Sequence, residues 1–276
     1  MGEFTIRIKL RLFLNGLNPI VIIFMNIIRE RIERLKDSNV IAYCLAYKGI
    51  CFFMRLLRFL RDPAYRSIVF TGLRFGQNYH QRDIATAPNR YPLLFQACAE
   101  YLTTIHNPKI LSFGCSTGEE VQSISQYILG AKVVGVDINK WCIRQCNRNN
   151  TNPDAKFIHR VSQEFSLETG FDAIFCMALF QRTENRSNKS NRVAQGFVFE
   201  QFEREVTLLD GKLNPGGLMI IDHSDFSFTD VGCAAKYIPL DFKQNQLVRN
   251  RPLFDPNNQK IAEVQNNYRV FVKSEG

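Results

Sequence analysis

Two kinds of hydrophobic pattern alternate along the chain from residue 109 onward. Short apolar runs typical of buried strands occupy residues 110–113, 132–137, 156–159, 172–178, 218–222 and 268–272. Between them, apolar positions recur at the spacing of an amphipathic helix over residues 119–128, 139–149 and 197–213. This alternation predicts an α/β fold with a doubly wound, mostly parallel sheet and a ligand cleft at the carboxyl ends of its strands.

The N-terminal part of the chain follows a different pattern. Residues 12–28 are uncharged but interrupted by Asn, Gly and Pro, and they fall short of the about 20 apolar residues that a membrane-spanning helix needs. Helical spacing continues through residues 28–35, and a second apolar stretch, 40–60, stops at Asp62-Pro63. These patterns predict two or three amphipathic helices.

The change of pattern predicts two regions. Residues 83–276 are expected to form the ligand-binding domain. Residues 1–82 are expected to form a basic, helical region that either caps this domain or lies on a membrane surface. Residues 65–92 have weak periodicity and predict a connector with short elements. The polar stretch 183–192 predicts a loop before the helical stripe at 197–213, and Asn214-Pro-Gly-Gly217 predicts the end of that helix.

Composition indicates a folded globular protein, with 45% hydrophobic and 22% charged residues. The eight cysteines are scattered and include no Cys-x-x-Cys pair, which is typical of reduced, buried thiols in a cytoplasmic protein. Cys142 and Cys146 lie one helical turn apart, but no histidine stands at the spacing of a zinc ligand, so no metal site is expected.

The net charge of +9 is concentrated near the N-terminus. Residues 1–82 contain 14 basic and 5 acidic residues, whereas the rest of the chain contains 21 of each. Two interpretations stay open. In the first, the excess positive charge binds an anionic partner, which is a membrane surface, an acidic protein or, less expected, a nucleic acid. In the second, the basic residues form a solvated face of ordinary helices.

The segment 110–120 places a glycine turn between a buried strand and the start of a helix. A P-loop would need Gly-Lys-Ser/Thr, but Gly118 is followed by Glu119, and a dinucleotide site would place a pyrophosphate against that carboxylate. A cofactor with a cationic end avoids this repulsion. S-adenosylmethionine has an ammonium, a sulfonium and an adenosine, and Asp137 at the end of the next strand can accept its ribose hydroxyls.

The same residues carry a resemblance to a known family. Gly114-Cys-Ser-Thr-Gly118 followed by Glu119-Glu120 resembles the glycine motif of class I S-adenosylmethionine-dependent methyltransferases, most closely the chemotaxis-receptor (CheR-type) enzymes. Residues 136–138, 171–176 and 213–225 agree with that family in order and spacing. The resemblance implies a seven-stranded, Rossmann-like methyltransferase sheet with an N-terminal helical cap, and S-adenosyl-L-methionine as cofactor.

The resemblance also implies cofactor-binding residues. The methionine part would lie against the turn, the ribose and adenine against the end of the second strand and the residues after the third, and the sulfonium against the end of the fourth strand. In that order the residues are Gly114, Cys115, Ser116, Thr117, Gly118 and Glu119; Asp137, Ile138, Ser162 and Gln163; and Met177 and Ala178. Ser112 departs from the acidic residue common in the wider class, and Met177-Ala178 from the Arg-Asn of the receptor enzymes.

Catalysis of methyl transfer needs alignment of the acceptor and, for a hydroxyl or amine, a base. His223 after the fifth strand is the candidate base, with Asp225 as orienting partner, although a histidine that only hydrogen-bonds a loop fits the pattern too. Three functions remain open: an O- or carboxyl-directed methyltransferase acting on a small molecule or protein side chain, a nucleic-acid methyltransferase that grips through the basic region, and a cofactor-binding or membrane-surface protein without catalysis. Phe180, Phe226 and Phe228 either line an acceptor pocket or belong to the core.

Overall fold

The computed structural model describes residues 41–186, 191–193, 197–242, 245, 252–262 and 268–275. The chain divides into two compact units, Met1–Arg66 and Ser67–Gly276, and we call the second unit the body. The described part of the first unit contains helix α3 (Ile41–Arg61) and the start of α4 (Pro63–Phe75). No described helix is both long and apolar enough to cross a membrane.

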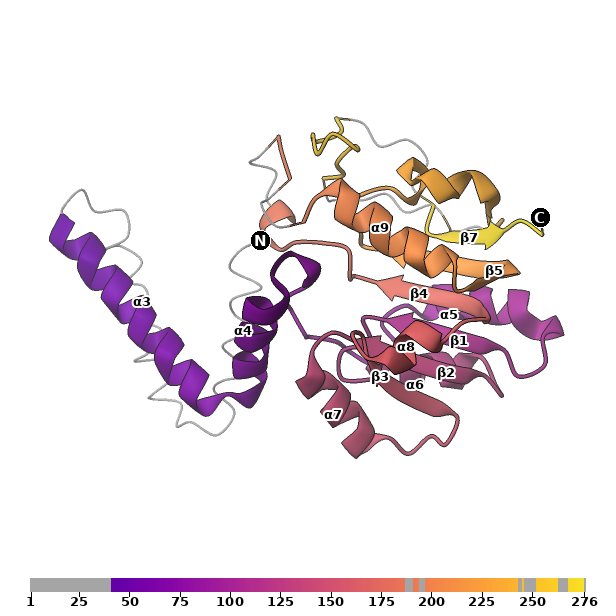
Figure 1. Ribbon diagram of the computed structural model, residues 1–276, viewed down its shortest axis with the longest axis horizontal. Coiled ribbons are helices and arrows are strands. Elements are labelled where there is room, and N and C mark those ends of the chain that lie inside the picture. Colours follow the sequence, from indigo (N-terminus) through magenta and orange to yellow (C-terminus); the bar gives the residue numbers. More distant parts are fainter. Residues whose placement is uncertain are drawn as a thin grey trace. The chain divides into compact units, whose positions relative to one another are not determined.

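A seven-stranded sheet forms the centre of the body (Figure 1). Its strands are β1 (Lys109–Phe113), β2 (Lys132–Asp137), β3 (Ala155–His159), β4 (Phe171–Met177), β5 (Leu213–Asp222), β6 (Tyr237–Pro239) and β7 (Val270–Lys273). The spatial order is β3-β2-β1-β4-β5-β7-β6, parallel from β3 to β5, with β7 antiparallel to both β5 and β6. The predicted mostly parallel, doubly wound sheet is confirmed, and its seven strands have the arrangement of the Rossmann-like methyltransferase fold.

Helices cover both faces of the sheet. One core cluster joins it to α5 (Pro92–Tyr101), α6 (Glu119–Tyr127) and α7 (Lys140–Asn149), and the other joins it to α8 (Gln163–Leu167) and α9 (Phe199–Asp210). Figure 1 shows α9 running along β4 and β5. Since five parallel strands end at one edge, the turns that follow β1, β2, β4 and β5 are brought together there.

Five short 3-10 helices complete the described elements. They are Gly76–Asn78, Leu102–Thr104, Glu184–Arg186, Phe228–Asp230 and Gly232–Lys236. The last two lie between β5 and β6. The 3-10 turn at Glu184–Arg186 occupies part of the predicted polar loop, and residues 187–190 lie outside the described residues, as do residues 12–28 and 28–35.

The predicted end of the helix before β5 was wrong. The helix ends at Asp210, and β5 begins at Leu213, so the strand runs through the Asn-Pro-Gly-Gly segment that was expected to separate the two. Leu213 pairs with Phe171, but the next pair in the ladder is Ala173 with Leu218, so the extra residues of β5 form an irregularity within the strand. A bulge accommodates glycine and proline without ending a strand.

The predicted connector at 65–92 was also wrong over its first part. Helix α3 ends at Arg61 as predicted from Asp62-Pro63, but the same pair begins α4, which continues to Phe75. Proline suits the first turn of a helix, where its missing N–H is not needed, and the Asp62 carboxylate accepts a hydrogen bond from the N–H of Tyr65 at 3.0 Å. The α5 and α8 helices were not predicted either, because each is short and weakly patterned.

Candidate functional site

The turn that links β1 to α6 is built on left-handed backbone. The φ angles are +92° at Gly114, +50° at Ser116 and +99° at Gly118, the N-cap residue of α6. The N–H groups of Gly114 and Cys115 donate to the carbonyl of Val136 at 2.7 and 3.0 Å. The glycines permit this tight path, and the hydrogen bonds hold the turn against the end of β2.

Asp137 closes the other side of this turn. Its carboxylate accepts hydrogen bonds from the N–H of Ser116 at 3.0 Å and from the N–H of Asn139 at 2.7 Å. Burial raises the pKa of Asp137 to about 6, and the two hydrogen bonds oppose that rise. A carboxylate has about four lone-pair positions, so two remain available to a ligand beside the turn.

Tyr79 adds a hydroxyl that the sequence did not indicate. The side chain is 3% exposed, and its oxygen lies near Asp137 and Asn139 without a well-aligned hydrogen bond to any described residue. Burial, and then the charge of Asp137, raise the pKa of Tyr79. A buried hydroxyl without a well-aligned partner is costly, so a polar ligand group beside it would stabilise the folded body.

Two carboxylates follow the turn in the first turn of α6. The Thr117 hydroxyl donates to Glu119 at 2.7 Å, and the buried Ser112 hydroxyl of β1 donates to Glu120 at 2.7 Å. Burial raises the pKa of Glu120 to about 8, against the effects of the Ser112 hydrogen bond and the Arg90 charge. Sequence analysis chose Glu119 and did not choose Glu120, whose bond to Ser112 depends on how α6 packs on β1.

The end of β4 lies beside the same turn. Ala178, with φ +56°, accepts a hydrogen bond through its carbonyl from Gln81 Nε2 at 3.2 Å. The side chain of Leu179 passes so close to Gly114 that a Cβ at that glycine would lie 2.9 Å from its Cδ1. The structure therefore brings Met177, the buried last residue of β4, and Ala178 to the turn.

The residues expected beside an adenine ring lie after β2 and β3. The carbonyl of Ile138 is 3.0 Å from Nε2 of His159, and burial lowers the pKa of His159. Ser162 caps α8, because its hydroxyl accepts from the N–H of Phe165 at 3.3 Å and donates to the carbonyl of His159 at 2.8 Å. Gln163 is the exposed first residue of that helix.

His223 follows the last residue of β5 and has φ +54°. Its Nδ1 lies 2.9 Å from Oδ2 of Asp222, a short contact whose alignment is poor for a hydrogen bond, and Arg269 lies 3.7 Å from the same oxygen. The ring is 5.8 Å from that of Tyr91. Because Asp222 pairs with Met177 across the sheet, the imidazole stands at the carboxyl ends of β4 and β5.

Asp225, the expected orienting partner of His223, is engaged by the loop after β4. Its Oδ2 accepts hydrogen bonds from the N–H of Arg182 and from Asn185 Nδ2, both at 2.7 Å, and none of the described contacts joins it to the imidazole. Asp225 thereby holds the loop after β4, and the neighbouring Asp222 contacts the histidine. Sequence analysis named Asp225 alone as the partner of His223 and did not consider Asp222.

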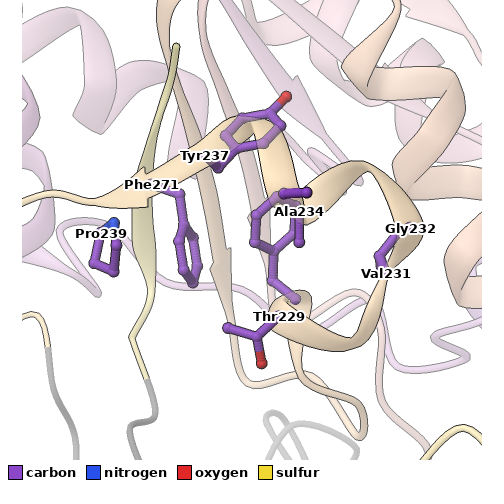
Figure 2. Close-up of a pocket in the computed structure, with 9 residues that line it drawn as sticks. Thr229, Val231, Gly232, Ala234, Tyr237, Pro239 and Phe271 are labelled. Carbon is purple, nitrogen blue, oxygen red and sulfur yellow. The ribbon is translucent and has the colours of Figure 1, made fainter.

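The three phenylalanines considered for an acceptor pocket are core residues. Phe180, Phe226 and Phe228 are at most 3% exposed and belong to the core cluster on the α9 side. Phe228 also borders a hollow of about 330 Å³ with Tyr237 and Phe271 (Figure 2). None of the expected cofactor-binding residues lines that hollow, so the candidate site is the edge formed by the ends of β1, β2, β4 and β5.

Comparison with known families agrees with this location. Residues 110–194 match the family model of a methyltransferase domain, a range that begins in β1 and ends beyond β4. This stretch of the body is similar to a methyltransferase domain. The matched range contains the glycine turn, Asp137 and the end of β4, while His223 lies outside it. Closeness to the chemotaxis-receptor enzymes is not shown by this match. No curated protein matches the chain.

Several solved methyltransferase structures are similar at low identity. The plantazolicin methyltransferase BpumL in complex with SAH is 20% identical, with 71% of this chain and 61% of that chain covered and a TM-score of 0.33. PKMT2 from Rickettsia typhi is 18% identical, with 46% and 25% covered and a TM-score of 0.33. An S-adenosylmethionine-dependent methyltransferase from Mesorhizobium loti is 15% identical, with 50% and 54% covered and a TM-score of 0.32. The match therefore spans 61% or less of the length of each.

Proposed function

We propose that this protein transfers a methyl group from S-adenosyl-L-methionine to an oxygen atom of its acceptor, with His223 as proton acceptor. One observation carries the proposal: the contact of 2.9 Å between His223 and Asp222 at the edge of the sheet where the methyltransferase domain places its glycine turn. A carboxylate beside an imidazole stabilises the imidazolium that forms when the ring takes up a proton.

The residues at this edge fit the proposed cofactor. The free lone pairs of Asp137 and the unsatisfied hydroxyl of Tyr79 suit ribose hydroxyls, and the carboxylate of Glu119 suits an ammonium. Positive φ at Gly114 lets the backbone approach the ligand closely. When bound, S-adenosylmethionine supplies a methyl group activated by its sulfonium. Leu179, packed against Gly114, separates this position from the core on the α9 side.

The base indicates which oxygen is methylated. A carboxylate acceptor is already a nucleophile and needs no base, whereas a hydroxyl must lose a proton during the transfer. The contact with Asp222 favours the Nδ1–H form of His223, which leaves Nε2 as the proton acceptor. The proposal is therefore a hydroxyl, on a small molecule or a protein side chain, in preference to a carboxylate.

The test compares two variants with the unaltered protein. Methyl transfer from labelled cofactor to a panel of hydroxyl and carboxyl acceptors is measured, together with the affinity for S-adenosylhomocysteine by calorimetry. His223→Gln is expected to lower kcat by about 10² to 10⁴ and Asp222→Asn by a smaller factor, with little change in that affinity.

The control is His106→Gln, an exposed histidine before β1, which should keep full activity. Mild alkali distinguishes the products, because it releases methanol from a methyl ester and leaves a methyl ether intact. An alkali-labile product, or full activity in His223→Gln, contradicts the hydroxyl proposal. Failure of the unaltered protein to bind S-adenosylhomocysteine contradicts the proposed cofactor.

A further inference from the structure

Helix α3 carries a row of exposed apolar side chains. Leu45, Phe52, Phe53, Leu56 and Leu60 are 62, 69, 56, 42 and 63% exposed. At 3.6 residues per turn, these positions fall within about 100° of the helix circumference. Exposed apolar residues on soluble proteins are usually scattered singly, so a row of this length indicates a surface that another apolar phase covers.

Positive charge accompanies this row. Helix α3 contains no aspartate or glutamate, and its basic residues are Lys48, Arg55, Arg58 and Arg61. Arg58 is engaged within the first unit, because it pairs with Asp62 at 3.3 Å and lies over the ring of Tyr65 at 4.4 Å. Lys48 and Arg55 are exposed along one edge of the row, and among the described contacts neither pairs with a carboxylate.

We propose that α3 lies in the plane of an anionic membrane surface. Leu45, Phe52, Phe53, Leu56 and Leu60 enter the boundary between headgroups and acyl chains, and Lys48 and Arg55 contact anionic lipid headgroups. Long basic side chains place their apolar stems along the membrane while their charges stay at the headgroups. This inference does not rest on methyl transfer.

Other partners match only part of the surface. A nucleic acid pairs with the charges but leaves five large apolar side chains in water. A second copy of α3 covers the apolar row but places Lys48 and Arg55 near like charges. Insertion across the bilayer is excluded for α3, because its four charged residues keep it below the hydropathy of a spanning helix. An anionic lipid surface covers the apolar row and also pairs with the basic side chains.

The experiment uses the full chain and two kinds of vesicle. One is phosphatidylcholine alone, and the other contains about one third phosphatidylserine. The protein is expected to float with the anionic vesicles, and binding should weaken with added salt, since exposed charges are screened. Phe52→Gln together with Phe53→Gln should lower the partition coefficient at least about tenfold. Each substitution removes the favourable free energy of moving an aromatic ring out of water, whereas glutamine has a helix propensity that preserves α3.

Charge variants and matched controls separate the two contributions. Lys48→Glu with Arg55→Glu should reduce binding to anionic vesicles and leave the weak binding to phosphatidylcholine unchanged. Leu129→Ser and Lys132→Glu, at exposed positions of the body, should bind vesicles like the unaltered protein. Unchanged far-UV circular dichroism and affinity for S-adenosylhomocysteine show that a variant has folded.

Four results overturn the proposal. The first is absence of flotation with anionic vesicles. The second is flotation that the Phe52 and Phe53 substitutions leave unchanged. The third is a dimer, seen by light scattering, that the same substitutions dissociate. Binding of single-stranded RNA that prevents flotation assigns the basic edge to nucleic acid and also overturns it.

Discussion

At the scale of single residues, His80 shows how the surroundings set the chemistry of a side chain. It is 5% exposed, lies between the rings of Phe180 and Phe197 at 5.8 and 4.8 Å, and its Nδ1 has no hydrogen-bond partner among the described residues. Burial lowers the pKa of His80 to about 4, and the nearby charge of Glu205 opposes this effect only in part. The ring is therefore neutral in the folded body at neutral pH.

This lowered pKa predicts acid sensitivity. Unfolded histidine takes up a proton near pH 6.5 and folded His80 near pH 4, so the free energy of unfolding should fall as the pH decreases between these values. The contribution of His80 to that fall is about 3 kcal/mol at most. Urea unfolding at pH 7.5 and pH 5 measures it, and His80→Leu should reduce the difference between the two. His106→Leu, at an exposed position, is the control, and an equal difference in His80→Leu contradicts the assignment.

Local sequence features pointed to part of the candidate site. Gly114 and Gly118 stood out as the glycines of a turn between a strand and a helix, where the structure has positive φ, and Asp137 as the carboxylate that ends the next strand. The hydrogen bond from Ser112 to Glu120 was missed because it joins two elements, and the contact of Asp222 with His223 was missed because Asp225 was the expected partner. Such contacts are set by tertiary packing and leave no periodic signal.

At the scale of elements, the turn between β1 and α6 depends on its second glycine. Gly118 has φ +99°, and a Cβ there would lie 3.3 Å from Sγ of Cys146 in α7. Gly118→Ala should therefore lower the free energy of unfolding by about 1–3 kcal/mol, from strained backbone and crowding together. It should also weaken binding of S-adenosylhomocysteine, because the turn and the start of α6 shift.

Gly211→Ala is the matched control for this substitution. Gly211 ends α9 with φ −66°, and a Cβ there meets backbone oxygens no closer than 3.6 Å. The free energy of unfolding of the Gly211→Ala variant should equal that of the unaltered protein or exceed it by up to about 1 kcal/mol. Urea unfolding and calorimetry on both variants make the measurement. Equal stability of Gly118→Ala and Gly211→Ala would show that the turn tolerates a side chain.

Sequence patterns located most elements but not every boundary. The strands β1 to β4 and the helices α6 and α7 begin and end within a residue of their predicted positions, because each has a clear apolar period. The boundaries predicted from proline and glycine were wrong at two places. Asp62-Pro63 ends one helix and begins the next, and Asn214-Pro-Gly-Gly217 lies within β5. Proline and glycine interrupt the apolar periodicity of the sequence. Whether the helix or strand itself ends there depends on its contacts with adjacent segments.

At the scale of the whole molecule, charge and ligand chemistry are separated along the chain. The first unit holds 12 basic and 5 acidic residues, and the body 23 and 21. The candidate cofactor residues all belong to the body, whose boundary at Ser67 also includes the segment with Tyr79 and His80. A domain running from 83 to 276, as the sequence suggested, would omit these two side chains.

This separation predicts how a ligand changes the stability of the protein. S-adenosylhomocysteine at about 100 times its dissociation constant should stabilise the body by about 2.7 kcal/mol, because it binds the folded state alone. For a body of this size the Tm should rise by roughly 5–10 °C. Asp137→Ala should lose most of this rise, since the carboxylate at the end of β2 is the proposed ribose contact. Phe52→Gln with Phe53→Gln should keep all of it, because both residues lie in the first unit. Thermal scans with and without the ligand make the measurement, and a full rise in Asp137→Ala contradicts the placement of the ribose.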